Sequence, residues 1–391
     1  MITKKEIENA LKQNDVSPVA YANYYDRNAY RDTVSLKQTM DNLRTGVNAT
    51  PQNPFSTGST QIVPGSLLSL DVDSNKVNWS ALAAKPTNKM LISIEGKQAL
   101  YRQELMILEM LTNINDDNWE RPIHFATTIT PSLYMDLQDT NFALNGLTYQ
   151  VVPGTPLYDG VNLDVAYETM VNKFRWGGLE NNSDIYMDET SRRMLSTYRL
   201  YFSQLIEALI KAGKKEMAIN ALDKVTSMIP DKVVPYSTDG LIFARSYFDV
   251  GETEKGKELI NTIHNRINAN MDWFQRLKPV DIANSLSDII YNNVNPLLLI
   301  KSVYQTHDYD SYLVLSDELM QLAQSFYMMG ITYVGDAIVR DVTESSVRGY
   351  YSANDQDTVM KSFEYEIMQS AMNMMKQFNP RLLEQYGVSP Q

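Results

Sequence analysis

The spacing of apolar residues divides the chain near residue 190. Before this point, short apolar or β-branched runs alternate with helical patterns, whereas after it strand signals become rare and helical periods dominate. We therefore predict α/β plus all-α architecture: a small α/β domain followed by a helical domain. The expected boundaries are 1–60 for an N-terminal extension with short helices, 61–189 for the α/β domain and 190–391 for the helical domain.

The clearest strand–helix–strand pattern of the first part surrounds the sequence NWERPIHFATTI at 118–129. Residues 90–94 (MLISI) are a short apolar run, 97–112 carry leucine and isoleucine at helical spacing, and 123–129 are strand-compatible. This succession is the outline of a βαβ unit, so we expect two parallel neighbouring strands covered by the helix. Further strands are predicted at 66–72 and 147–152, and further helices at 3–13, 35–43 and 161–174.

Two successive pairs of helices are predicted in the second part, at 194–212 with 214–228 and at 239–250 with 253–268. Their turns fall at Gly213 and Gly251, which are 251 − 213 = 38 positions apart, close to the period of about 34 residues in tetratricopeptide repeats. Small and large apolar residues fall where paired helices of that repeat must approach or fill a groove, namely at Ala218, Leu222, Ala244, Tyr247, Gly256 and Ile260. The sequence thus predicts a tetratricopeptide-like helical-hairpin domain, with repeat units at about 194–230 and 237–270.

The pattern continues less regularly to the C-terminus. A third helical pair is predicted at 283–304 and 309–329, with Pro296 as a kink or break. Residues 330–351 show no clear helix or strand pattern. Residues 355–378 are predicted to form a terminal helix rich in methionine. Beyond these helices, the sequence predicts neither the structure nor the role of residues 285–391.

Composition narrows the classes of function. Hydrophobic residues make up 43% of the 391 residues, enough for a substantial core, and the formal net charge is −12. Nucleic-acid binding is disfavoured because it needs a clustered basic surface. The absence of cysteine excludes disulfides and thiol chemistry. The longest aliphatic run, 297–300, is far shorter than the ~20 residues of a membrane span.

The sequence contains no recognisable catalytic constellation. The motifs GxSxG, GxGxxG and the P-loop are missing, so nothing indicates a hydrolase or nucleotide-binding protein. His124, His264 and His307 lie far apart and lack HxxxH or HExxH spacing. We therefore predict neither a metal site nor a cofactor.

The most distinctive polar stretch is NKFRWGG at 172–178. Arg175 beside Trp176 could stack on a sugar or pair with a carboxylate. The structural alternative is a clamp at the domain junction, with Trp176 buried, the glycine pair turning the chain and Asp188 capping the next helix. Our candidate binding residues are Arg121, His124, Arg175, Trp176, Tyr186 and Asp188.

Four motifs, in order across about residues 60–270, carry a family resemblance: NWERPIHFATTI, LTYQVVPGTP, MVNKFRWGGLENNSDIYMDETSRRM and ALIKAGKKEMAINALDKVTSMIPDKVVPY. They resemble the C-terminal soluble region of a bacterial family of multi-pass inner-membrane proteins, a domain of unknown function that is similar to GT-C protein O-mannosyltransferases. The resemblance implies a periplasmic location, a lipid-linked sugar donor for the whole protein and a membrane-embedded part preceding residue 1. Catalytic acids of GT-C enzymes lie beside the membrane helices, so none is transferred to this chain.

These inferences lead to one expectation and two alternatives. We expect a non-catalytic periplasmic domain of a membrane glycosyltransferase-like protein, which recognises an acceptor protein, another protein partner or a glycan. It would meet the membrane only through the preceding region; a native start at Met1 would instead make it cytoplasmic. The alternatives are a structural scaffold without a ligand, and a stand-alone carbohydrate-active enzyme with two carboxylates roughly 5–10 Å apart in one cleft.

Overall fold

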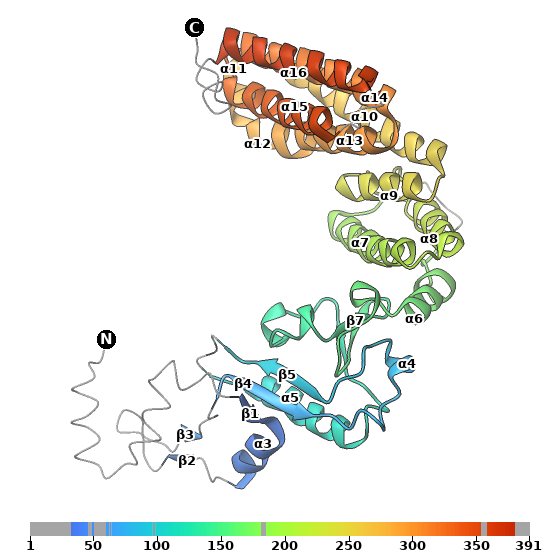
Figure 1. Ribbon diagram of the computed structural model, residues 1–391, viewed down its shortest axis with the longest axis vertical. Helices are drawn as coiled ribbons and strands as arrows, with labels where there is room; N and C mark the ends of the chain where they lie inside the picture. Colours follow the sequence, from blue (N-terminus) through green and yellow to red (C-terminus); the bar gives the residue numbers. More distant parts are fainter. Residues whose placement is uncertain are drawn as a thin grey trace, which may run out of the picture. The chain divides into compact units, whose positions relative to one another are not determined.

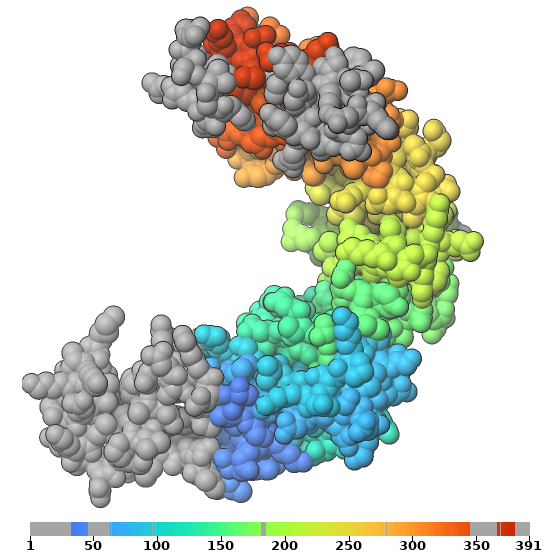
Figure 2. Space-filling model, viewed as in Figure 1, coloured from blue at the N-terminus to red at the C-terminus, as the bar shows by residue number. Residues whose placement is uncertain are grey.

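The chain forms two compact units in the computed structural model, and Figures 1 and 2 colour them along the sequence. The α/β unit comprises Met1–Arg175 and Glu207–Met217, and the helical unit comprises Trp176–Ile206 and Ala218–Gln391. The helix predicted at 3–13 and most of the extension predicted at 1–60 lie outside the described residues. The structure describes residues 33–45, 49–50, 60–61, 63, 65–95, 97, 99–180, 185–352 and 358–379.

The first sheet of the α/β unit has the strand order β1-β4-β5. Its middle strand β4 (Leu67–Asp71) runs parallel to β1 (Thr33–Ser35) and antiparallel to β5 (Lys89–Ser93). Helix α3 (Leu36–Thr45) follows β1 directly and precedes β4 in the chain. A βαβ connection is therefore present, because α3 lies between two parallel neighbouring strands, but its position in the sequence differs from the predicted one.

Apolar cross-strand pairs hold this sheet to its covering helices. Leu68 lies opposite Ile92 and Leu70 opposite Met90, and all four side chains are buried. They form one core with apolar residues of α3 and of α5 (Arg102–Asp116). Alternate residues of a strand face the same side, which explains why these two pairs share one face.

The predicted parallel pairing of residues 90–94 with 123–129 is wrong. Strand β6 (His124–Ala126) lies in a second sheet of order β6-β8-β7, in which both pairings are antiparallel. Its neighbour is β8 (Thr148–Val151), which also pairs with β7 (Phe142–Leu144). Residues 90–94, by contrast, lie almost entirely in β5 of the first sheet.

Two local features explain the different pairing. Asn118 and Trp119 both adopt left-handed backbone conformations, with φ of 53° and 62°, so the chain turns sharply after α5. Trp119 is buried, which fixes that turn in the core. Farther along, Gly146 has φ of 103° and closes a tight hairpin between β7 and β8. This hairpin supplies β6 with an antiparallel partner, because β8 pairs with β7 on one side and with β6 on the other.

An aromatic cluster fills the space beside the second sheet. The ring centroids of Phe125 and Phe142 are 5.2 Å apart, and Tyr134 contacts both rings edge-on at 5.8 and 5.0 Å. Tyr149 stacks on Phe142 at 5.4 Å. The Tyr134 hydroxyl donates to the Ile129 carbonyl at 3.0 Å, so this buried ring is satisfied at its polar end.

Short segments complete the α/β unit. The helix predicted at 161–174 is split into an α-helical part, α6 (Leu163–Tyr167), and a π-helical part, η5 (Glu168–Lys173). The remaining pieces are β2 (Ala49–Thr50), β3 (Thr60–Gln61), α4 (Trp79–Leu82), η2 (Pro131–Leu133), η3 (Leu137–Asp139) and η4 (Tyr158–Gly160).

Helices make up the rest of the described chain, as the sequence predicts (Figure 1). Packed neighbours along the chain include α9 with α10, α13 with α14, α14 with α15 and α15 with α16. Residues 330–351, for which the sequence predicts no element, belong largely to α15. The helices are α7 (Glu189–Lys211), α8 (Lys215–Met228), α9 (Thr238–Asp249), α10 (Thr253–Phe274), α11 (Pro279–Asn284), α12 (Leu286–Ile289), η6 (Ile290–Val294, π), α13 (Asn295–His307), α14 (Tyr309–Met328), α15 (Thr332–Ser352) and α16 (Thr358–Phe378).

Glycine and proline mark the helix ends where the sequence predicts them. Gly213 and Gly251 have φ of 71° and 83°, the left-handed conformation that ends a helix, and Gly330 repeats it at 76° between α14 and α15. Pro296 lies in the first turn of α13, directly after the π-helical segment η6. Because proline lacks an N–H group, the hydrogen-bond ladder is interrupted there, which fits the predicted break.

A buried arginine ties three segments of the helical unit together. The Arg199 side chain of α7 is fully buried and donates to Asp239 of α9 at 2.8 Å. It also donates to the carbonyls of Ile229 and Val234 at 2.6 and 2.7 Å, and its guanidinium lies 4.2 Å from the centre of the Tyr236 ring. Burial raises the pKa of Tyr236 to about 12. Arg199 therefore fixes the loop between α8 and α9.

Candidate functional site

Two of the candidate binding residues lie at the surface around β6. His124 is the first residue of β6 and is exposed, with its Nδ1 3.3 Å from the Thr148 hydroxyl. Partial desolvation lowers the pKa of the His124 ring below its ordinary value. Arg121 is 86% exposed and forms an ion pair with Asp117 at 3.2 Å. Such an exposed pair contributes little to stability.

Arg175 and Trp176 lie in different surroundings although they are adjacent in sequence. Arg175 is exposed and is the last residue of the first segment of the α/β unit. Trp176 begins the helical unit and is only 5% exposed. Its ring contacts Phe202 and Tyr198 of α7, with centroid distances of 5.9 and 6.4 Å. This packing favours the structural alternative for Trp176, because the indole is buried and contacts two rings of α7.

The segment after Trp176 folds onto itself. Gly177 and Gly178 have φ of 62° and 96°, which favours glycine at both positions. The Glu180 carboxylate accepts hydrogen bonds from the N–H groups of Trp176 and Gly178 at 3.1 and 3.3 Å. The bond from Trp176 is the main reason that the pKa of Glu180 lies below its ordinary value. The glycine pair therefore turns the chain, as the structural alternative predicts.

Asp188 and Tyr186 complete the candidate set. Asp188 accepts a hydrogen bond from the Ser191 N–H at 2.7 Å, in the first turn of α7, and this bond lowers the pKa of the carboxyl group. Asp188 thus caps α7, as predicted. Tyr186 is 89% exposed. The six candidates divide between the two units, and the structure leaves their role in binding a prediction.

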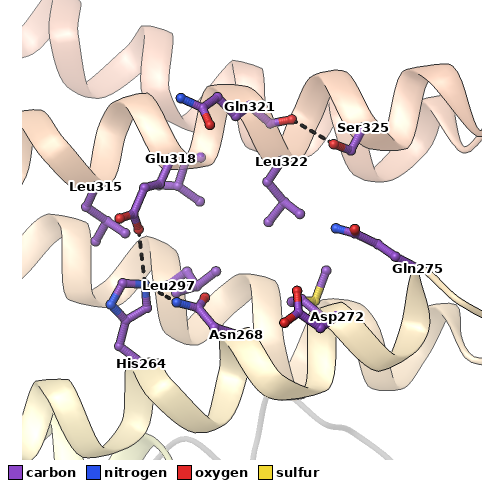
Figure 3. A pocket seen from close by; sticks show the side chains of 12 residues that line it. His264, Asn268, Asp272, Gln275, Leu297, Leu315, Glu318, Gln321, Leu322 and Ser325 are labelled. Atoms are coloured by element: carbon purple, nitrogen blue, oxygen red, sulfur yellow. Dashed lines mark hydrogen bonds and ion pairs between the residues drawn. The ribbon is translucent and has the colours of Figure 1, made fainter.

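A groove in the helical unit is a second candidate site, which we did not predict from the sequence (Figure 3). Its cavity volume is about 280 Å³, and it lies between α10 and α14 with Leu297 of α13 behind. The groove is lined by His264, Asn268, Met271, Asp272, Gln275, Leu297, Leu315, Glu318, Leu319, Gln321, Leu322 and Ser325.

Apolar side chains form the floor of the groove. Met271, Leu297, Leu315 and Leu319 are each less than 5% exposed, and Leu322 is half-buried. They come from three helices that also pack together, α13 contacting both α10 and α14. A floor of this kind can bury apolar groups of a ligand, and each buried methylene would contribute about 0.8 kcal/mol.

Polar side chains form the rim. His264 Nε2 lies 3.2 Å from Glu318 Oε2 and 3.3 Å from Asn268 Nδ2, so one end of the groove is bridged from α10 to α14. At the other end, the Gln275 side chain points toward Leu322, with Asp272 nearby (Figure 3). None of the ion pairs between described residues involves Asp272.

The sequence does contain a signal for this groove. His264, Asn268, Asp272 and Gln275 are spaced by four, four and three residues, so they form a polar stripe along one helix. Met271 beside this stripe is buried. The stripe alone does not identify a groove, because the facing residues lie on α14, at least 40 positions away in the sequence.

Neither a metal cluster nor a membrane span is found among the described residues. No group of three or more histidine, aspartate and glutamate side chains in that part of the chain is arranged to hold a metal ion. Within the same residues, no helix combines the length and apolar character needed to cross a bilayer.

Comparison with protein families gives one match. Residues 2–167 match the family model of TMEM260-associated domain 2. The match covers less than half of the chain and is consistent with a TMEM260-like family. It ends at the last residue of α6, so the groove lies outside the matched residues. No curated protein and no solved structure matches the chain.

Proposed function

We propose that the chain is a non-catalytic part of a membrane-associated protein and that its helical unit binds a protein partner or acceptor protein. The observation that carries this proposal is the groove between α10 and α14, with its apolar floor and polar rim. The match to TMEM260-associated domain 2 supports the membrane association. The resemblance to GT-C glycosyltransferase-like proteins supports a place on the periplasmic side of the inner membrane.

The groove has room for apolar side chains of a polypeptide, because its volume is about 280 Å³. Apolar side chains of a partner would fit this space, while the rest of the partner would contact the rim. Central, buried anchors of this type supply most of the binding energy at protein interfaces.

We also propose that the helical unit contains tetratricopeptide-like helical hairpins. A Cβ atom at Gly256 would lie 2.9 Å from the Phe248 ring and 3.0 Å from the Ala244 carbonyl oxygen. Helices α9 and α10 therefore approach closely at the two positions, Ala244 and Gly256, where the repeat needs small residues. Stacked hairpins of this type present extended binding surfaces, which supports partner recognition.

A photo-crosslinking experiment tests the proposed function. Benzoylphenylalanine replaces Gln275 at the groove, or Glu258 on α10 as a matched control, since Glu258 is exposed and does not line the groove. The full chain is then irradiated with membrane and periplasmic extracts of the source organism. We expect discrete cross-linked proteins from position 275 alone. Equal yields from both positions, or adducts from neither, would contradict binding at the groove.

A further inference from the structure

The charge of the groove constrains what can occupy it. Two acidic residues, Asp272 and Glu318, line it, whereas lysine and arginine are absent from its lining. Arg276 and Lys278 follow Gln275 in the sequence but do not line the groove. The chain as a whole carries a formal net charge of −12. A ligand with positive charge beside its apolar groups would therefore be attracted to the rim.

The groove offers side chains, not main-chain groups, for recognition. Its walls are α-helices, whose interior N–H and C=O groups are bonded within each helix, so an extended peptide could not add to them as a strand. The amide groups of the rim are also partly engaged: Asn268 Nδ2 lies 3.3 Å from His264 Nε2, and Gln321 donates to Asp317 at 2.8 Å. A ligand that satisfies its own main chain, namely a helix, fits these walls best.

The length of the apolar floor of the groove determines how many side chains of a bound helix it can hold. Leu315 and Leu322 lie seven residues apart on α14, which corresponds to roughly 10 Å along the helix axis. Two side chains on the same face of a bound helix, at positions i and i+3 or i+4, are about 5–6 Å apart and would both fit over this span.

We infer that the groove binds a basic amphipathic helix of a partner protein. Two neighbouring apolar side chains enter between α10 and α14, and lysine or arginine residues beside them face Asp272 and Glu318. This inference rests on the proposed function and specifies the chemistry of the partner.

A selection experiment tests the inference and keeps it separate from the proposed function. A library of random peptides of about 16 residues, roughly four helical turns, is selected on the immobilised full chain. Peptides that also bind a Leu322→Glu variant are removed, because this substitution places a charge over the floor. Circular dichroism and amide exchange verify that the variant keeps its fold.

We expect the groove-dependent peptides to be rich in lysine and arginine and to carry apolar residues at i and i+3 or i+4. Groove-dependent peptides that are acidic, or that lack helical spacing, would overturn the inference and leave the proposed function standing. A selection that yields no groove-dependent peptide would overturn both.

Charge reversal then tests the role of the rim. A selected peptide carrying a fluorophore is titrated with wild type, Asp272→Lys and the control Glu258→Lys. We expect Asp272→Lys to weaken binding about tenfold, equivalent to about 1.4 kcal/mol, and Glu258→Lys to leave the affinity near that of wild type. Equal loss in both variants would show a long-range effect of net charge and would contradict specific pairing at the groove.

Discussion

Both units of this chain pack aromatic rings together, but the helical unit also buries cations that join its helices. In the α/β unit, four aromatic residues between positions 125 and 149 meet directly in one cluster. In the helical unit, buried cations bridge helices that are distant in sequence: Arg199 reaches Asp239, and Lys301 of α13 reaches Asp341 of α15. Arg199 and Lys301 are 0% and 1% exposed.

This difference explains why a groove is found between helices of the helical unit. Rings that are close in sequence fill part of a small sheet-based core, so their contribution depends on volume. Long helices meet along ridges and leave grooves between them, and buried ion pairs such as that of Arg199 add polar contacts across these interfaces. In the helical unit, part of the apolar surface between α10 and α14 is left open as the groove described above.

The largest effect should come from removing the buried cation of the helical unit. Arg199→Ala deletes the ion pair with Asp239 and leaves two loop carbonyls without their donor. We expect a loss of roughly 3–5 kcal/mol in the free energy of unfolding. Amide exchange should rise in α7, α9 and the loop between α8 and α9. An equal rise of amide exchange in the β6-β8-β7 sheet would contradict the proposal that Arg199 stabilises the helical unit alone.

A change of volume should act mainly in the α/β unit. Phe142→Leu removes ring contacts with Phe125, Tyr134 and Tyr149 without adding charge. We expect a loss of about 1–3 kcal/mol, measured by urea denaturation, with increased amide exchange confined to the β6-β8-β7 sheet. Faster exchange in the groove helices α10 and α14 would contradict this account.

Gly256 tests how closely the helices of the helical unit approach. In an ordinary helix, replacing glycine with alanine is stabilising by about 1 kcal/mol. Here the added methyl group would meet Phe248 at 2.9 Å and the Ala244 carbonyl at 3.0 Å. We therefore expect Gly256→Ala to destabilise the chain by about 1–2 kcal/mol. A rise in melting temperature would show that the α9–α10 contact is looser than described.

The smallest effect should come from Asp308, which caps α14. Asp308 accepts hydrogen bonds from the Ser311 N–H and from Lys257, and the bond from Lys257 is the main reason that its pKa is lowered. Because the folded-state pKa is below the unfolded value near 4, the stabilisation is complete at neutral pH and is lost as pH falls through the folded pKa.

We expect Asp308→Asn to cost up to about 1 kcal/mol at pH 7, because asparagine can still cap the helix but loses the charge that pairs with Lys257. Urea denaturation at several pH values should show that this difference shrinks as the medium becomes strongly acidic. A difference that stays constant across the acid range would exclude the charged carboxylate as its source.

The sequence predicted the helices better than the strand pairing. Helical periods and turn glycines placed α7 to α10 closely, since both signals are local. The βαβ prediction failed because strand pairing depends on tertiary contacts that a local sequence pattern does not contain. In the structure, β6 pairs with β8 of the β7–β8 hairpin. The Asn145-Gly146 pair is a hairpin signal that could have revealed β7.

The candidate site shows the same limit. Capping by Asp188 and turning at Gly177-Gly178 follow from local chemistry and were predictable. The groove was not predictable, because its floor combines Met271, Leu297 and Leu315 from three helices. Each residue alone is an ordinary core side chain, and only tertiary structure shows that the surface they form remains open.

Methyl spectroscopy of the methionines tests the central claim, that the groove of the helical unit is the binding surface. The full chain is labelled with ¹³C at its methionine methyl groups and titrated with a peptide from the selection described above. We predict that the Met271 signal shifts on binding, while those of Met90 and Met170 in the α/β unit stay in place. Shifts at Met90 or Met170 with none at Met271 would contradict the account.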